Sequence, residues 1–230
     1  MIEVSSLGKV YGKRDHEFIA LHDVTFQVPD GTSVAIIGKS GSGKSTLMHI
    51  MSGLDHPSSG AVVVDGEDIS GLKQKQLDNF RAEKIGFIFQ SFFVQANESC
   101  YHNVSLPLEI TNVSGVERTK RINDALEQVE LSDKTHEKAR NLSGGQKQRL
   151  AIARAIVNKP KIIFADEPTG NLDSTTGEKI ESLLFSFNKT MKTTLVIVTH
   201  DAELAAKCDM QIEMKDGKVV KVTKPKGKQL

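Results

Sequence analysis

Several features are scarce in this 230-residue chain, and their scarcity narrows its class. The two cysteines, Cys100 and Cys208, lie far apart and have no neighbouring ligand pairs, which disfavours a disulfide framework or a zinc cluster. We expect both thiols to be reduced and structural. The chain has 30 Lys and Arg residues and 29 Asp and Glu residues, so its charge is nearly balanced. It therefore has no electrostatic field of one sign that would favour a nucleic acid partner.

Long hydrophobic runs are also missing. The longest, such as residues 195–198, have the length of a β-strand and fall far short of the ~20 residues that a membrane-spanning helix needs. Residues 1–4 show neither the basic nor the apolar segment of a secretory signal. The sequence therefore predicts a soluble cytosolic chain with room for one large domain, or for a domain and a subdomain.

The most informative stretch is residues 38–45, which match the pattern G-x-x-x-x-G-K-[ST] directly after the apolar run 33–37. Small residues let backbone N–H groups curl around a phosphate, Lys44 adds a positive charge, and Ser45 offers a hydroxyl to Mg²⁺. The alternative is a flexible Gly/Ser linker, which the strand-like and helix-like flanks disfavour. The predicted phosphate contacts are Gly38, Lys39, Ser40, Gly41, Ser42, Gly43, Lys44, Ser45 and Thr46.

An antiparallel sheet is predicted ahead of this loop. Residues 2–4 and the alternation of Val24, Phe26 and Val28 are typical of strands with one buried face. We place Tyr11 in the loop between these first strands, where its ring can stack on a base. The alternative is a tyrosine at the edge of the core.

Two adjacent carboxylates, Asp166 and Glu167, end the strand-like run 161–165. Acidic residues at the carboxyl end of a strand, in a chain with a phosphate loop, suit Mg²⁺ binding and activation of water. We expect Asp166 to act through the metal and Glu167 to be the general base for the attacking water. An exposed acidic turn is the alternative.

Two other strand ends carry weaker signals. Gln90 follows the buried run 85–89 and can orient water or complete a Mg²⁺ shell, although an ordinary glutamine at a strand end fits equally. His200 follows the run 193–199, which we expect to be the last core strand, and can contact the γ-phosphate, although a lone histidine is usually structural.

Between these strands, residues 91–141 contain no strand-like run, and residues 116–131 place apolar side chains at helical spacing. We therefore predict a helical insertion in an α/β core. The irregular residues 91–101 include the apolar residues 92–94, which form a partner contact or are buried in the insertion.

Residues 142–146, Leu-Ser-Gly-Gly-Gln, precede an amphipathic helix at 147–156. Ser143 suits the N-cap, and free N–H groups at the glycines offer a second phosphate site. Beyond 210 we expect a hairpin turning at residues 216–217. The tail then carries lysines that are solvated or contact an anionic membrane surface, namely Lys218, Lys221, Lys224, Lys226 and Lys228.

These motifs occur in a fixed order over about residues 2–220, and together they resemble the ATP-binding cassette (ABC) ATPases of membrane transporters. Leu-Ser-Gly-Gly-Gln between the phosphate loop and the Asp-Glu strand is that family's distinguishing signature. The sequence of residues 165–173, with Asn-Leu-Asp at 171–173, is similar to that of the lipoprotein-releasing and macrolide-export (LolD/MacB-like) subgroup. Residues 91–100 depart from the Leu-Leu-Pro-rich stretch common in that subgroup.

The resemblance implies an ATPase with ATP and Mg²⁺ as cofactors. Tyr11 would stack on adenine, Gln90 would sense the metal and the membrane partner, and His200 would hold the γ-phosphate. Two copies would close head to tail on ATP, so that the signature of one chain covers the nucleotide of the other. The residues implied to contact nucleotide in this way include Ser143, Gly144, Gly145, Gln146 and Asp173.

The expected fold is α/β, a P-loop NTPase (RecA-like) core with an antiparallel β subdomain and an inserted α-helical subdomain. The core would span about residues 1–90 and 156–222, the helical subdomain about 91–155, and the basic tail 223–230. The chain would sit on the cytoplasmic face of the cell membrane through a separate permease, without nucleic acid. The alternatives are a soluble ABC-type ATPase that acts on nucleic acid or ribosomes, and an unrelated P-loop kinase.

Overall fold

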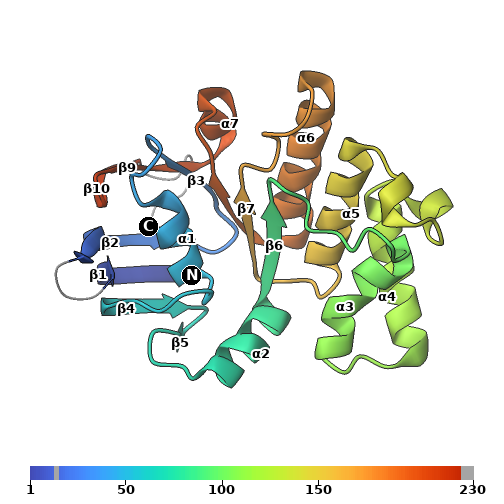
Figure 1. Cartoon of the computed structure of the whole chain (residues 1–230), viewed down its shortest axis with the longest axis horizontal. Coiled ribbons are helices and arrows are strands. Elements are labelled where there is room, and N and C mark those ends of the chain that lie inside the picture. The colour runs from blue at the N-terminus through green and yellow to red at the C-terminus, as the bar shows by residue number, and fades with distance from the viewer. Residues whose placement is uncertain (13–15, 224–230) are drawn as a thin grey trace.

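A computed structural model describes residues 1–12 and 16–223. Within these residues the strands form two sheets, one with the order β2-β1-β4-β5 and one with the order β10-β9-β3-β8-β7-β6 (Figure 1). The first sheet contains β1 (Ile2–Tyr11), β2 (Phe18–Val28), β4 (Ser59–Val64) and β5 (Glu67–Asp68). The second contains β3 (Ser33–Ile37), β6 (Ile85–Phe89), β7 (Ile162–Asp166), β8 (Thr194–Val198), β9 (Met210–Lys215) and β10 (Lys218–Val222).

The first sheet is antiparallel, as the alternation of apolar residues predicts. The predicted position of Tyr11 in a loop is wrong, because Tyr11 is the last residue of β1 and pairs with Phe18 of β2. Pairing continues through Val10 and Ile19, past several register shifts in β1. Cross-strand pairing therefore extends β1 as far as Tyr11.

The central strands of the second sheet, β3, β7 and β8, are parallel and buried on both faces, as parallel strands usually are. Along β7, Phe164 packs toward the antiparallel sheet and α1 (Lys44–Met51), whereas Ile163 and Ala165 pack toward the helices on the other side. The expectation that the strand after residue 193 is the last core strand is wrong. β9 also belongs to this sheet: it pairs parallel with β3 and antiparallel with β10, so the predicted hairpin joins the core through its first strand.

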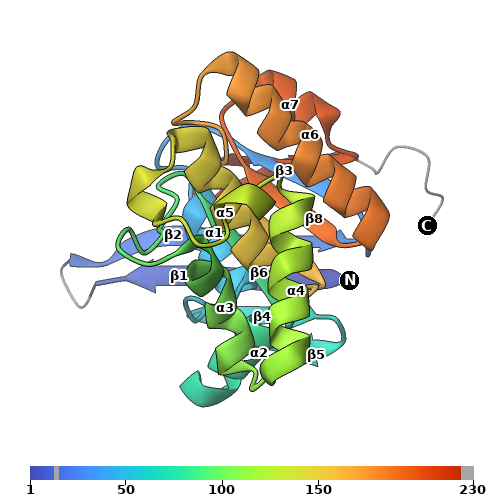
Figure 2. The ribbon, with the colours of Figure 1, turned by 90° about the vertical axis from the view of Figure 1, so that its right-hand side faces the viewer.

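Helices cover the second sheet. Besides α1, those outside the insertion are α2 (Gln74–Lys84), α6 (Ser174–Met191) and α7 (Ala202–Lys207). All described elements between β6 and β7 are helical, which confirms the predicted α/β fold with a helical insertion; Figure 2 looks onto this side. These elements are α3 (Cys100–Ile110), α4 (Gly115–Gln128), the short η2 (Ser132–Lys134) and η3 (Ala139–Asn141), and α5 (Gly144–Ile156).

Several smaller predictions have clear outcomes. Cys100 and Cys208 are both buried thiols. The hairpin turn at residues 216–217 joins β9 to β10, and Lys218 and Lys221 lie in β10. The predicted basic tail beyond residue 223, with Lys224, Lys226 and Lys228, lies outside the described residues. Within the described part of the chain, no helix is long and apolar enough to cross a membrane.

Candidate functional site

The predicted phosphate loop connects β3 to α1, so it lies at the carboxyl end of a central parallel strand. Gly38 has φ 151°, and a Cβ atom there would lie 2.3 Å from the Met214 carbonyl oxygen of β9. A side chain is therefore excluded by close backbone approach. Lys44 Nζ donates hydrogen bonds of 2.9 Å to the carbonyl oxygens of Gly38 and Lys39, which folds the ammonium back over the loop.

The helix that follows presents an open N-terminus. Its N-cap is Gly43 in the left-handed conformation, and among the described residues no side chain caps it. The first N–H groups of α1 are therefore available to an anion at the positive end of the helix dipole. The β9–β10 turn is hydrogen-bonded to the phosphate loop, because the Gly217 N–H donates to the Ser42 carbonyl oxygen at 3.1 Å.

Strand register gathers the other predicted residues at the same edge of the sheet. Phe89 of β6 pairs with Asp166 of β7, and Asp166 pairs with Val198 of β8. Gln90, Glu167 and Thr199 each follow one of these three residues, and β3, which leads into the phosphate loop, is the neighbour of β8. Ligands of parallel α/β sheets bind at this edge.

The Glu167 carboxylate is held by three donors. Its Oε1 accepts the His200 N–H at 3.1 Å and lies 2.7 Å from His200 Nδ1, and its Oε2 accepts the Thr199 hydroxyl at 3.2 Å. Glu167 itself has φ 45°, a conformation that costs free energy for a residue with a side chain. The structure thus brings the predicted base and the predicted histidine together and adds Thr199, which the sequence reading missed.

Asp166 lies half-buried beside this carboxylate. Burial, followed by the negative charge of Glu167, raises the pKa of the Asp166 carboxyl above its ordinary value, against the opposing effects of His49 and Lys44. The ionised form is thus costly in the ligand-free protein. A cation near Asp166 would offset this cost.

Gln90 is exposed and pairs with the loop that follows β7. Its Nε2 donates to Asn171 Oδ1 at 3.3 Å, and Asn171 Nδ2 donates to the Gln90 carbonyl oxygen at 3.0 Å. This reciprocal amide pair ties the end of β6 to residues 171–173. In the ligand-free protein the Gln90 amide is therefore oriented by a partner from a neighbouring loop.

Ser143 is the N-cap of α5, as predicted. Its hydroxyl accepts the Gln146 N–H at 3.3 Å, and Gln146 Oε1 accepts the Ser143 N–H at 2.9 Å, which together form a capping box. Gly145 is closely packed, since a Cβ atom there would lie 2.5 Å from Thr176 Cγ2 of α6. A groove of about 860 Å³ lies along residues 143–146 and the start of α6.

Residues 143–146 lie far from the phosphate loop of the same chain. Figure 1 shows α1 and α5 on opposite sides of β6 and β7. Asp173, the N-cap of α6, lies on the α5 side and accepts the Thr176 N–H at 3.0 Å, a hydrogen bond that lowers the pKa of its carboxyl. One chain therefore carries two separate groups of predicted nucleotide contacts.

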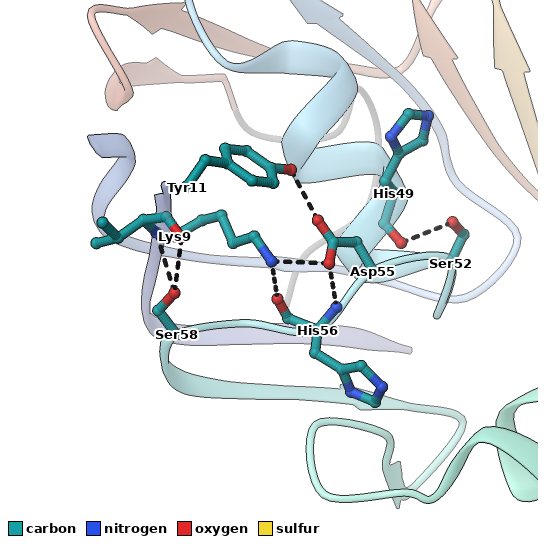
Figure 3. A network of polar contacts seen from close by, with 8 residues as sticks. Lys9, Tyr11, His49, Ser52, Asp55, His56 and Ser58 are labelled. Carbon is teal, nitrogen blue, oxygen red and sulfur yellow. Dashed lines mark hydrogen bonds and ion pairs between the residues drawn. The ribbon is translucent and has the colours of Figure 1, made fainter. Parts of the chain in front are cut away.

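Tyr11 is held by residues that the sequence reading did not single out (Figure 3). Its hydroxyl donates to Asp55 Oδ2 at 2.7 Å, and Lys9 Nζ lies 4.7 Å from the centre of its ring. The ring remains partly exposed. No motif signals Asp55, because it lies in a Pro- and Ser-rich loop that reads as an ordinary connection.

The apolar residues 92–94 are divided between surface and interior. Phe93 is exposed and packs its edge on Phe89, whereas Val94 packs against the core of the helical side. Arg154 of α5 donates hydrogen bonds to the Phe92 and Phe93 carbonyl oxygens at 3.2 and 2.7 Å. The segment after Gln90 is thus connected to the helix that begins at Gly144.

Comparison with known proteins agrees with this geometry. The family model described as ABC transporter matches residues 21–170. The uncharacterized ABC transporter ATP-binding protein YbbA of Escherichia coli (strain K12) is 42% identical over 219 residues, covering 95% of this chain and 96% of that protein. The lipoprotein-releasing system ATP-binding protein LolD of Syntrophus aciditrophicus is 40% identical over 220 residues, covering 96% and 99%.

Among solved structures, a dimeric post-hydrolysis state of the ATP-binding cassette MJ0796 bound to ADP and Pi has a TM-score of 0.89. It is 41% identical in sequence, and the match covers 99% of this chain and 100% of that one. The likeness extends over the whole described fold, including the antiparallel sheet and the helical insertion.

Proposed function

Because this chain belongs to the ABC transporter family, we propose that it is the ATP-binding and ATP-hydrolysing subunit of a transporter complex, and that it drives a separate membrane permease by dimerising on ATP. One observation carries the proposal. The phosphate loop and the Ser143 cap with its two glycines lie on opposite sides of β6 and β7, so neither group alone surrounds a nucleotide (Figure 1). A second copy placed head to tail supplies the missing half.

Each end of ATP has its own contacts in this proposal. Tyr11 stacks on the adenine, and residues 38–46 hold the phosphates through backbone N–H groups and the Lys44 ammonium. Glu167 is the general base for the attacking water, and His200, which contacts Glu167 at 2.7 Å, holds the γ-phosphate. Contacts between Glu167, Thr199 and His200 keep the base oriented before the nucleotide arrives.

Mg²⁺ suits the residues beside the phosphate loop. We assign the Ser45 hydroxyl, the Asp166 carboxylate and the Gln90 amide as its protein ligands, directly or through water. Oxygen ligands of this kind, with phosphate and water completing the shell, are typical for this ion. The raised pKa of Asp166, caused by burial and by Glu167, supports a cation at this position. When bound, the ion neutralises phosphate charge during transfer.

The partner chain contributes the residues of its Leu-Ser-Gly-Gly-Gln signature. Ser143, Gly144, Gly145 and Gln146, with Asp173 at the start of α6, would face the nucleotide held by the phosphate loop of the other copy. The MJ0796 cassette, which is dimeric with ADP and Pi, supports this arrangement. Closure on ATP and opening after hydrolysis then follow from the difference in nucleotide contacts between the two states.

We place the complex at the membrane, with the chain bound peripherally to the cytoplasmic side of the permease. LolD relatives, named for lipoprotein release, support a role in the lipoprotein-releasing and macrolide-export subgroup. The subdomain limits that we propose are a core of about residues 1–90 and 156–222 and a helical part of about 91–155, with a tail at 223–230. The helical part and exposed Phe93 are the surface for the permease.

Hydrolysis of ATP by the purified full chain tests the first half of the proposal. Lys44→Ala removes the ammonium above the loop and is expected to lose ATP affinity and turnover, whereas Lys189→Ala, an exposed lysine of α6, keeps both. Unchanged ATP binding by Lys44→Ala would contradict the phosphate-loop assignment.

Affinity purification from gently solubilised native membranes tests the second half. A stoichiometric partner with about four membrane spans and a large extracytoplasmic domain supports the lipoprotein and macrolide subgroup. A many-span permease keeps the transporter and rejects the subgroup. Recovery with ribosomes or DNA alone, together with ATPase stimulation by them, would overturn the membrane role.

A further inference from the structure

The side chain of Tyr11 belongs to a small polar network with Lys9, Asp55 and His56 (Figure 3). Asp55 is its centre: Oδ2 accepts the Tyr11 hydroxyl, and Oδ1 accepts Lys9 Nζ, both at 2.7 Å. Lys9 Nζ also donates to the His56 carbonyl oxygen at 2.6 Å. The Tyr11 hydroxyl and the Lys9 ammonium thus both donate hydrogen bonds to the Asp55 carboxylate.

Lys9 is unusually well buried for a lysine, with 9% of its surface exposed, whereas Tyr11 is 38% exposed. Lysine is rarely this buried unless it is paired, and here its partner is Asp55. The ammonium lies 4.7 Å from the ring centre, within the range of a cation–π contact. The Lys9 ammonium therefore occupies one face of the Tyr11 ring, and a base can stack only on the opposite face.

Asp55 is fixed to the end of α1. The N–H groups of Leu54 and Asp55 donate to the His49 carbonyl oxygen at 2.8 and 3.2 Å, so the loop continues directly from the last turn of the helix. The same helix begins at Lys44 in the phosphate loop. A helix of this length spans roughly 12 Å and is stiff, so it sets the distance from the phosphate loop to Asp55.

The protonation states favour this network at neutral pH. Burial and then the Asp55 carboxylate raise the pKa of the Tyr11 hydroxyl, which keeps it a donor. Burial opposes ionisation of Asp55, but the hydrogen bonds from Lys9 and Tyr11 outweigh it and hold the pKa of that carboxyl below its ordinary value. Asp55 therefore stays an acceptor for both partners.

We propose that Asp55 and Lys9 are positioning residues for nucleotide binding, which fix the ring of Tyr11 in height and tilt relative to the phosphate loop. The inference rests on the proposed role of Tyr11 as the platform for the base. It assigns to Asp55 and Lys9 an effect on the base end of the nucleotide and none on the phosphate end. Since stacking tolerates any purine, the effect is equal for ATP and GTP.

A double-mutant cycle on the full chain separates positioning from general stability. The variants are Asp55→Asn, Tyr11→Ala and the double variant, and the probes are ATP, GTP and inorganic tripolyphosphate, each measured by direct binding. Loss of one stacked aromatic ring is expected to weaken ATP and GTP binding about tenfold. Asp55→Asn is expected to weaken both about three- to fivefold, within the usual range of coupling between contacting residues.

Two further results are expected. In the Tyr11→Ala background, Asp55→Asn has no additional effect, because there is no ring left to position. Tripolyphosphate binds all variants as it binds the wild type. Asp65→Asn is the matched control: Asp65 also pairs with a lysine, Lys84 at 3.1 Å, and its φ of 51° is well tolerated by asparagine. It should leave all three affinities unchanged.

Other outcomes overturn the proposal in distinguishable ways. If Asp55→Asn weakens tripolyphosphate as much as ATP, or keeps its effect without the Tyr11 ring, then the network is structural and does not position the base. If Tyr11→Ala binds ATP like the wild type, the platform and its positioning both fail, while the ATPase assignment, tested by Lys44→Ala, stands.

Discussion

Gly145 provides a sharp test of the packing at the start of α5. An alanine Cβ there would lie 2.5 Å from Thr176 Cγ2, about 1 Å inside normal carbon contact. Overpacking of this kind costs about 1–3 kcal/mol, and the gain in helix propensity from glycine to alanine returns at most about 1 kcal/mol. We therefore expect Gly145→Ala to lower the free energy of unfolding by about 1–2 kcal/mol.

Thermal unfolding of the nucleotide-free chain measures this effect. For a chain of this length each kcal/mol corresponds to a Tm change of about 2–4 °C. The clash is with one methyl group, so Gly145→Ala in a Thr176→Ser background should be neutral or slightly stabilising. The cap of α6 survives that change, because Asp173 accepts the backbone N–H of Thr176.

Gly144→Ala is the matched control. Its nearest neighbour would be Leu172 Cδ2 at 3.8 Å, an ordinary contact, so no destabilisation is expected. If Gly145→Ala unfolds at the temperature of Gly144→Ala, or if Thr176→Ser gives no relief, the close approach of α5 and α6 is not what excludes a side chain. ATP turnover of both alanine variants is a separate measurement, since both glycines are proposed to face a partner's nucleotide.

Three other predictions concern the sheet edge and the core. Glu167→Gln should bind ATP, lower phosphate release by about 10²–10⁴-fold and accumulate a dimer seen by light scattering; turnover at the wild-type rate would exclude Glu167 as the base. Asp166 has a pKa above its ordinary value of 3.8 in the folded state, so the native protein binds the proton more tightly and loses stability as pH rises through this range. Asp166→Asn should therefore raise the Tm of the ligand-free protein by a few degrees at pH 7 and by nothing near pH 3, and an unchanged Tm at pH 7 would contradict the burial argument. Phe164→Ala, at a fully buried side chain that stacks on Phe87, should cost about 3–5 kcal/mol in chemical denaturation, and a loss below 1 kcal/mol would mean that this core collapses around the cavity.

The sequence predicts most of the fold because its signals are local. Apolar runs predict the parallel strands, and Ser143 is typical of a helix N-cap. The pattern around Lys44 predicts a phosphate loop between a strand and a helix. The sequence predicts the ends of β6, β7 and β8 for the same reason, because a polar residue after an apolar run marks the point where the strand leaves the core. The roles of these residues in catalysis stay predictions.

What the sequence did not predict depends on pairing between distant segments. The sequence predicts a loop at Tyr11, and only pairing with β2 extends β1 to this residue. The sequence predicts a hairpin beyond residue 210, and only the pairing of β9 with β3 places its first strand in the central sheet. Asp55 and Thr199 carry no motif, and their relation to Tyr11 and Glu167 exists only in the folded chain.

The position of β9 also sets an order of events during synthesis. The Met214 carbonyl oxygen faces Gly38, and the Gly217 N–H binds the Ser42 carbonyl oxygen, so the phosphate loop is completed by residues that are translated much later than the loop itself. At ordinary elongation rates roughly 10–35 s separate the two segments. A nascent chain stopped before residue 210 has the whole motif but not its support. Nucleotide capture should therefore wait until β9 has been made, and nascent chains that lack β9 should not compete for ATP.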